Sequence, residues 1–305
     1  MRTVIQSTIF ILFTGLIVAS CGDKNYYGWD DAQSRQIVLS SSVTLAAQPK
    51  LQDLQIESGQ QLSLFITPNN TPAELLYNNV NIIADGKGGF VSQNMYYPLD
   101  GRNIDFFAIH PYVGGASLST PASFSIVANQ ADKTNYLDSD LLHATHFDQV
   151  RTTEAVGMTF SHKLSKLDFT IVNNEGLDLG ALNTVTALSI LPSTTIDIAD
   201  GTITEATGTP VNVTAYGVTG SPEARASVSD IHAIIVPQTI PVNTPLFRIS
   251  IGQQSYTYTT TEALTFEGGK EYNTQLTITG GEIILTSTIN EWGDGGSIGG
   301  GLTPD

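Results

Sequence analysis

The residue with the clearest chemistry in this sequence is Cys21, its only cysteine. It follows an apolar run, Ile9 to Val18, that is too short to span a bilayer comfortably. A basic residue near the start, this apolar run, and the small residues Ala19 and Ser20 before a cysteine are typical of a bacterial lipoprotein signal. We therefore predict that residues 1–20 are a signal peptide and that Cys21 becomes a lipid-bearing N-terminus. The alternative is an ordinary signal peptide beside an incidental cysteine.

Two histidines with ligand-like spacing, His143 and His146, lie between Asp140 and Asp148. Histidines three residues apart share one face of a helix, whereas on a strand they point to opposite sides. A zinc site needs further ligands, and the sequence offers none at an evident spacing. We therefore predict a polar loop beside the domain junction and no metal site.

Other patterns that could carry chemistry are weak or missing. The acidic turns at 138–140 and 197–201 do not fit the twelve-residue calcium loop. The glycine clusters at 86–89 and 293–301 lack the lysine and serine or threonine that end a phosphate loop. The sequence has no Gly-x-Ser-x-Gly segment that leads from a strand pattern into a helix pattern, as a nucleophile elbow would, and it does not single out a serine, histidine and aspartate that belong together. We predict no enzymatic activity and no cofactor other than the covalent lipid on Cys21.

Two tyrosine pairs are candidates for stacking on sugar rings, together with Trp29. They are Tyr96 with Tyr97, and Tyr256 with Tyr258. The second pair is two residues apart, so its members share one face of a strand. A shared face is more often used for packing between strands than for a ligand platform.

Composition and charge restrict the classes of partner. The full sequence has a net charge of −16, and loss of the signal peptide makes it one unit more negative because Arg2 is removed. Nucleic acid would be repelled by this charge. With Cys21 lipidated, no thiol remains for a disulfide, so the core must stabilise the exported chain. Charged residues make up only 14% of the chain, and abundant threonine, serine and glycine are typical of all-β extracellular modules.

Short runs of alternating apolar and polar residues extend from residue 36 to the end, separated by turn-forming residues. This pattern predicts β-sandwiches. Residues 148–157 are polar and precede a fresh strand pattern, so we place a domain boundary there. The predicted organisation is a tether over 21–35, an N-terminal β-sandwich over 36–155, and a C-terminal β-sandwich over 156–305 with a terminal strand and a glycine-rich tail.

Several segments together resemble the fimbrillin-like proteins, which are the subunits of type V pili. Besides the lipoprotein signal, these segments are Phe106–Tyr112, Asp140–Ala144, Phe160–Leu167, Phe266–Ile278 and Ile289–Trp292. Their order and spacing extend over nearly the whole mature chain. The resemblance implies two tandem transthyretin-like Greek-key β-sandwich domains and export as a lipoprotein to the outer membrane and the fimbrium.

The resemblance also implies assembly by strand donation between subunits. In polymerising members a trypsin-like protease removes the first strand after a basic residue, and an extended strand of another subunit fills the groove. Here the removable strand would be Gln36–Val43, and the candidate processing sites are Arg35 and Lys50. A cut at Arg35 would release the tether and leave the strand in place. Stalk pilins tend to have an arginine shortly after this strand, whereas here the next arginine is Arg102.

The candidate donor is the segment 282–292, with Ile283, Leu285, Ile289 and Trp292 as its apolar side chains. The alternative is that this segment is simply the last strand of the second sandwich. We therefore expect a structural or adhesive fimbrial subunit, or a lipidated anchor subunit if no cut occurs. Its expected partners are other pilin subunits, the outer membrane through its lipid and, as a further candidate, a host protein or glycan. A non-polymerising surface lipoprotein that binds glycans is the main alternative, and a lipid-held hydrolase has no positive feature.

Overall fold

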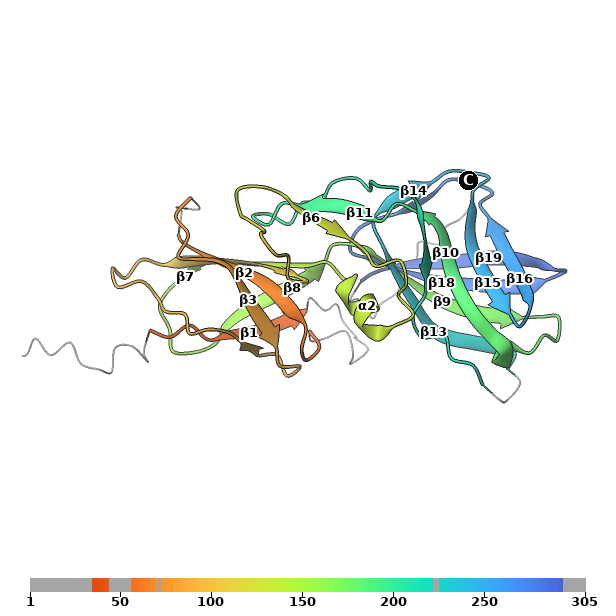
Figure 1. The fold of residues 1–305 in the computed structure, drawn as a ribbon, viewed down its shortest axis with the longest axis horizontal. Helices are drawn as coiled ribbons and strands as arrows, with labels where there is room; N and C mark the ends of the chain where they lie inside the picture. The colour runs from red at the N-terminus through yellow and green to blue at the C-terminus, as the bar shows by residue number, and fades with distance from the viewer. Residues whose placement is uncertain (1–34, 44–55, 70, 72, 222–224, 293–305) are drawn as a thin grey trace, which may run out of the picture.

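The computed structural model describes residues 35–43, 56–69, 71, 73–221 and 225–292. In these ranges the regular structure is almost entirely β-strand, with one short helix, α2 (Lys133–Asp138), and a 3-10 turn at Leu179–Ala181. The predicted all-β class is therefore confirmed. Figure 1 shows an elongated molecule with one group of strands towards each end of its long axis. The ranges described contain no helix with the length and apolar character needed to cross a membrane.

The first half is built on one seven-stranded sheet with the order β1-β8-β7-β5-β2-β3-β4. Its strands are β1 (Leu39–Val43), β2 (Gln61–Pro68), β3 (Tyr77–Ala84), β4 (Phe90–Val91), β5 (Ile104–His110), β7 (Leu142–Gln149) and β8 (Val156–His162). Neighbouring strands are antiparallel except β1 and β8, which are parallel. The two edges of the sheet approach each other, because Ser40 bridges Gly89 and Gln36 bridges Tyr96. The sheet therefore curls almost closed, and β1 lies at its seam.

The central strands β2 and β5 are buried on both faces. One face carries Leu64 and Phe106, which belong to the core inside the curled sheet. The other face carries Phe65 and Phe107, which belong to a second core shared with the rest of the protein. Burial on both faces explains why these strands read as nearly continuous apolar runs instead of alternating ones.

The second half contains two four-stranded sheets with the orders β13-β9-β18-β19 and β12-β10-β15-β16. Phe169 of the first sheet meets Phe247 of the second edge to face, with ring centroids 5.2 Å apart, so the two sheets enclose one core. The strands β14 (Gln238–Ile240) and β17 (Leu264–Phe266) form a separate ribbon. The strands of the two larger sheets are β9 (Ser165–Asn173), β10 (Leu182–Ile190), β12 (Val211–Thr214), β13 (Ser227–Ile235), β15 (Pro245–Ile251), β16 (Gln254–Thr259), β18 (Lys270–Thr279) and β19 (Glu282–Glu291).

A segment between β5 and β7 crosses from the first half to the second. Within it β6 (Ala122–Ser125) pairs with β11 (Ser193–Ile196). Further along, the buried Gln130 side chain accepts a hydrogen bond from the Ile234 N–H and donates one to the Ile234 carbonyl, both 2.8 Å long. The halves are therefore joined by packing and hydrogen bonds as well as by the chain.

The predicted break at 148–157 lies between β7 and β8, and both of these strands belong to the first sheet. The change from one sheet to the next comes between β8 and β9, a few residues after the predicted boundary at 155/156. A polar connection inside a sheet has the same composition as a linker between domains, which is why the sequence places the break early. The division into two tandem domains stays a prediction.

Candidate functional site

The first strand of the protein is held mainly by backbone hydrogen bonds to β8 and to the turn before β4. In the parallel register Leu39 lies opposite Val156, and Val43 lies opposite Phe160. The Val156 N–H donates to the Val38 carbonyl over 2.8 Å. On the seam side, the Ser41 N–H donates to the Gly88 carbonyl over 2.7 Å. The segment predicted as removable, 36–43, therefore occupies the seam of the first sheet.

Side chains of this segment complete the first core. Ile37, Leu39 and Val43 are each at most 6% exposed and lie among the apolar residues inside the curled sheet. On β8, Met158 and Phe160 are also fully buried. Loss of the segment would open an apolar trough and expose one edge of β8, with its unpaired N–H and C=O groups.

The predicted processing and lipidation residues lie at or beyond the limits of the described ranges. Arg35 lies just before the strand, and its carbonyl accepts a hydrogen bond of 2.9 Å from the Tyr97 N–H. Lys50 and Cys21 are outside the described residues. Protease processing at Arg35 or Lys50 and lipidation of Cys21 therefore stay predictions.

The predicted donor segment forms β19, an edge strand that pairs antiparallel with β18 along all ten residues. Ile283 and Trp292 are buried, and Leu285 and Ile289 are partly buried against the second core. Ile284 points outwards and is 53% exposed. The four apolar side chains singled out in the sequence therefore pack on the core from a strand that has one free edge in the described sheet.

Trp292 closes the end of β19 through a set of contacts that sequence reasoning missed. Its indole stacks on the His162 imidazole with ring centroids 3.8 Å apart and an angle of 7° between the planes. The backbone N–H of Trp292 donates to the Gly269 carbonyl over 2.7 Å. The neighbouring Glu291 forms an ion pair with Lys270. His162 is oriented by Asp140, whose carboxylate lies 2.9 Å from the imidazole Nδ1.

We refer to Trp292, His162, Asp140 and Gly269 as the Trp292 clasp. Among the described residues the buried Nε2 atom of His162 has no hydrogen-bond partner, so this part of the chain combines a favourable ring stack with an unsatisfied polar atom. His162 and Trp292 both lie in segments that resemble the fimbrillin-like proteins. The sequence could identify the two segments, although it carries no signal that they touch.

The predicted polar loop at His143 and His146 is wrong, because both residues lie on β7 and point to opposite sides of that strand. His143 is buried, and its Nε2 lies 2.9 Å from the Ile198 carbonyl. His146 packs against the Phe106 ring. Burial lowers the pKa of His143 below its ordinary value. Across the described residues no group of three or more histidine, cysteine or acidic side chains is placed to hold a metal ion.

The tyrosine pairs considered for sugar stacking mostly pack inside the protein. Tyr97 is 2% exposed, and Tyr258 stacks on Phe247 with ring centroids 6.2 Å apart. Tyr256 lies partly buried against the second core. Trp29 is outside the described residues. These pairs therefore do not form an exposed aromatic platform.

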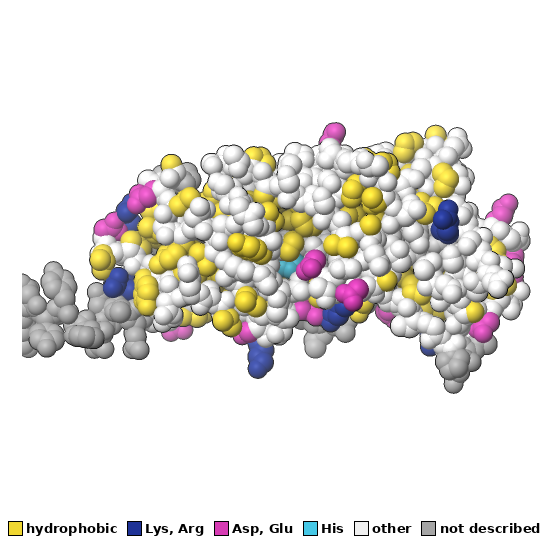
Figure 2. Space-filling model, viewed as in Figure 1, with side chains coloured by type: hydrophobic (Ala, Val, Ile, Leu, Met, Phe, Trp, Pro, Cys, Tyr) yellow, Lys and Arg dark blue, Asp and Glu magenta, His cyan; other side chains and the backbone are white. Residues whose placement is uncertain are grey.

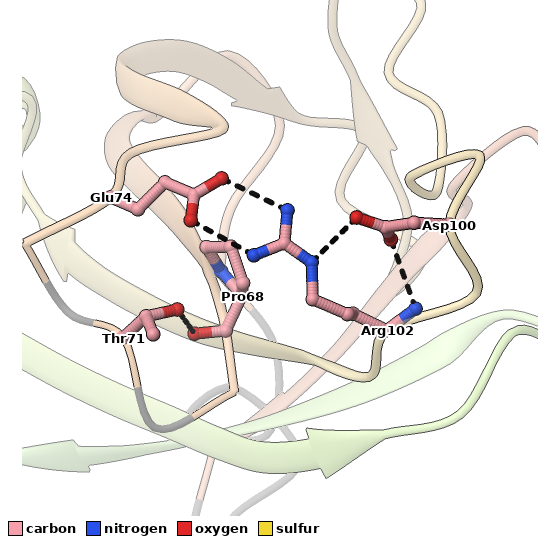
Figure 3. A network of polar contacts seen from close by, with 5 residues as sticks. All are labelled: Pro68, Thr71, Glu74, Asp100 and Arg102. Atoms are coloured by element: carbon pink, nitrogen blue, oxygen red, sulfur yellow. Dashed lines mark hydrogen bonds and ion pairs between the residues drawn. The ribbon is translucent and has the colours of Figure 1, made fainter.

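A second polar cluster fixes the loop between β2 and β3. Figure 3 shows the Arg102 guanidinium between two carboxylates, with both oxygens of Glu74 at 2.9 and 3.0 Å and Asp100 at 2.7 Å. The hydrogen bonds with Arg102 lower the pKa of Glu74 and of Asp100. In the same loop the Thr71 hydroxyl donates to the Pro68 carbonyl over 3.0 Å. All three charges are used within the cluster, which therefore has a structural role.

A family model described as fimbrillin-like matches residues 48–292. The fold is similar to that of a candidate cell adhesion protein from Bacteroides uniformis ATCC 8492, with 19% sequence identity, a TM-score of 0.62, and coverage of 84% of this chain and 98% of that chain.

A second candidate cell adhesion protein with a similar structure comes from Bacteroides ovatus ATCC 8483. Its sequence identity is 16% and the TM-score is 0.64, with coverage of 85% of this chain and 98% of that chain. At these identities the structural likeness shows the fold. No curated protein matches the chain in sequence.

Proposed function

We propose that this chain, which belongs to the fimbrillin-like family, is a structural subunit of a fimbria at the cell surface, where its partners are other pilin subunits. The family consists of fimbrial structural proteins and not of enzymes. The observation that carries the proposal is the family match together with a first strand that lies at the seam of its sheet. Lipidation of Cys21 would hold the exported chain at the outer membrane before assembly.

Assembly would proceed by exchange of the seam strand. β1 contributes apolar side chains to the first core. Its backbone is held by the parallel pairing with β8 and by a few hydrogen bonds across the seam. Its removal by a protease leaves a groove that an extended segment can fill with the same kinds of contact. Lys50 follows β1 in the chain and is the candidate cut that frees the strand. A cut at Arg35 alone would keep the strand and remove only the tether.

The donor would be β19 of another subunit. It is an edge strand, and Ile283, Leu285 and Ile289 are spaced two residues apart or four apart on one face. A segment with one apolar face suits a groove with an apolar floor. Release from its own sheet requires opening the Trp292 clasp.

Treatment of the purified chain with a trypsin-like protease tests this function. Electron microscopy should show filaments after cleavage between β1 and β2, and Lys50→Ala should prevent both cleavage there and filament formation. Arg35→Ala is the matched control and should leave filaments unchanged. A cleaved chain that stays monomeric under all conditions and binds glycans would contradict the pilin role and favour the glycan-binding alternative.

A further inference from the structure

An open hollow of about 470 Å³ lies where the turn between β8 and β9 meets the loop between β11 and β12 and the ribbon formed by β14 and β17. Lys163 of the turn, Glu205 of the loop, and Thr239 and Thr265 of the ribbon line it. None of these four residues belongs to β1 or to β19. The volume falls within the range of about 300 to 1,000 Å³ that small-molecule sites occupy.

The walls of the hollow are held in place by contacts within the protein. Gly268 packs so closely on the turn that a Cβ at this position would lie 2.6 Å from the Lys163 carbonyl oxygen. In the loop the Thr204 N–H donates to the Thr195 carbonyl over 3.0 Å, and the Thr195 N–H donates to the Thr204 hydroxyl over 3.0 Å. A ligand therefore enters a site that it does not have to order.

Lys163 brings a positive charge that the protein does not pair. Its side chain is half-buried, and among the described residues no ion pair involves it. The nearby lysines Lys166 and Lys270, by contrast, form ion pairs with Glu271 and Glu291.

The surroundings of this ammonium group make an anionic ligand favourable. Burial lowers the pKa of Lys163 below its ordinary value, and the charge of Asp200 acts in the opposite direction without forming an ion pair. A cation that is partly withdrawn from water without a paired anion is destabilising. An entering carboxylate would offset this cost and accept charge-assisted hydrogen bonds.

A second hydrogen-bond donor comes from the ribbon. Thr239 and Thr265 lie opposite each other in the register of β14 and β17, and their hydroxyl oxygens are 3.0 Å apart. One of the two hydroxyl groups donates to the other, so the hydrogen of the accepting hydroxyl is left to donate elsewhere. Both residues are exposed. The hollow therefore offers an ammonium group and a hydroxyl donor to the same ligand.

Glu205 restricts the ligand class further. It is exposed, and its carboxylate accepts hydrogen bonds from hydroxyl groups but repels a second negative charge. The net charge of −16 adds to this repulsion for any polyanion. A molecule with one carboxylate and several hydroxyl groups matches the cation, the hydroxyl donor and the acceptor of the hollow together.

We propose that this hollow binds a sugar acid with a single carboxylate, which lies on the Lys163 ammonium and the Thr239–Thr265 hydroxyl pair, while a ring hydroxyl donates to Glu205. The ligand chemistry is that of an acidic residue at the end of a glycan. A fimbrial subunit would then carry a ligand site that is separate from its first and last strands. The proposal holds for the uncleaved chain and does not depend on assembly.

A ligand-observed NMR titration of the purified uncleaved chain tests the proposal, with glucuronate as the probe. Glucose is the matched neutral sugar, because it differs from glucuronate only in having a hydroxymethyl group in place of the carboxylate. Inorganic phosphate, tested by competition with glucuronate, probes for a simple anion site. Glucuronate should bind saturably and more weakly as the salt concentration rises, whereas glucose and phosphate should bind at least about tenfold more weakly.

Substitutions identify the groups that hold the probe. Lys163→Gln should weaken glucuronate binding at least about tenfold, and Lys163→Arg should stay within about threefold of the unchanged chain because it keeps the charge. Thr239→Val combined with Thr265→Val should weaken binding by about threefold or more. Lys87→Gln is the matched control, because it removes one exposed positive charge from the turn before β4 and should leave the affinity unchanged.

Glucose binding equal to that of glucuronate would overturn the proposal, as would a Lys163→Gln variant that unfolds at the same temperature and binds as tightly as the unchanged chain. Phosphate that binds more tightly than glucuronate would show a simple anion site and overturn the sugar-acid assignment. Filament formation after protease treatment is measured on the same variants. Lys163→Gln that forms normal filaments supports a site separate from assembly, whereas loss of its filaments would overturn that separation. Glucuronate binding by a chain that never forms filaments would overturn the proposed function and leave this site standing.

Discussion

Replacement of Trp292 by alanine should release β19 from the second sheet while the rest of the protein stays folded. Trp292 is 7% exposed, and truncation of a buried aromatic side chain to alanine costs about 3 to 5 kcal/mol. Part of this loss is offset, because the unpartnered Nε2 of His162 becomes hydrated, which recovers about 1 kcal/mol or more. A net cost of about 3 kcal/mol corresponds to about a 100-fold increase in the open population of β19.

Hydrogen exchange read by mass spectrometry can measure this opening strand by strand. Peptides from β19 should exchange about 100-fold faster in Trp292→Ala, whereas peptides from the central strand β5 should change little. Ile284→Ala is the control on the same strand, because Ile284 is 53% exposed and should cost no more than about 0.5 kcal/mol. Protection of β19 that changes less than tenfold, or β5 losing protection as much as β19, would refute the clasp as the element that retains the strand.

Three further predictions concern pH, a strained glycine and the lipid. Burial lowers the pKa of His110 and of His143 below the ordinary 6.5, so the unfolded chain binds more protons than the folded one below that pH. Stability in urea should therefore fall by up to about 1.4 kcal/mol per pH unit for each histidine as the pH drops below about 6.5, and a flat profile would contradict their neutral burial. Gly201→Ala should lower the thermal stability more than Gly115→Ala does, because both glycines have φ near +75° and only a Cβ at 201 would collide with the His143 ring. Equal decreases in melting temperature for the two variants would show that the collision is relieved. The mature chain should begin at an acylated Cys21, and a mass spectrum with an unmodified or later N-terminus before fimbrial processing would contradict the lipoprotein prediction.

Local patterns in the sequence identify most of the strands but not their partners. The alternating run around Ile283–Trp292 predicts β19 within a residue at either end. The parallel pairing of β1 with β8 joins segments more than a hundred residues apart, and the period of two is the same whichever strand lies beside it. The pairing of β6 with β11, which ties the halves together, is hidden for the same reason.

The sequence predicts the segments that form the candidate site, but it does not predict the contacts between them. The two strands could be predicted from the sequence because each carries its own apolar face, whereas their roles as removable strand and donor strand are implied only by the resemblance to the fimbrillin-like proteins and stay predictions. The stack between His162 and Trp292 could not be predicted, since it depends on how the ends of β8 and β19 meet in space. Figure 2 shows acidic and basic side chains together over α2, near the middle of the long axis.

The central claim is that β1 must leave its seam for subunits to assemble, and a reversible disulfide tests it most directly. Ser42→Cys with Thr159→Cys in one chain should link β1 to β8, because the two hydroxyl oxygens are 3.4 Å apart. The double variant with Cys21→Ser, treated with protease, should stay monomeric when oxidised and form filaments when reduced, while each single variant forms filaments in both states. Filaments from the oxidised double variant at the rate of the single variants would contradict the account.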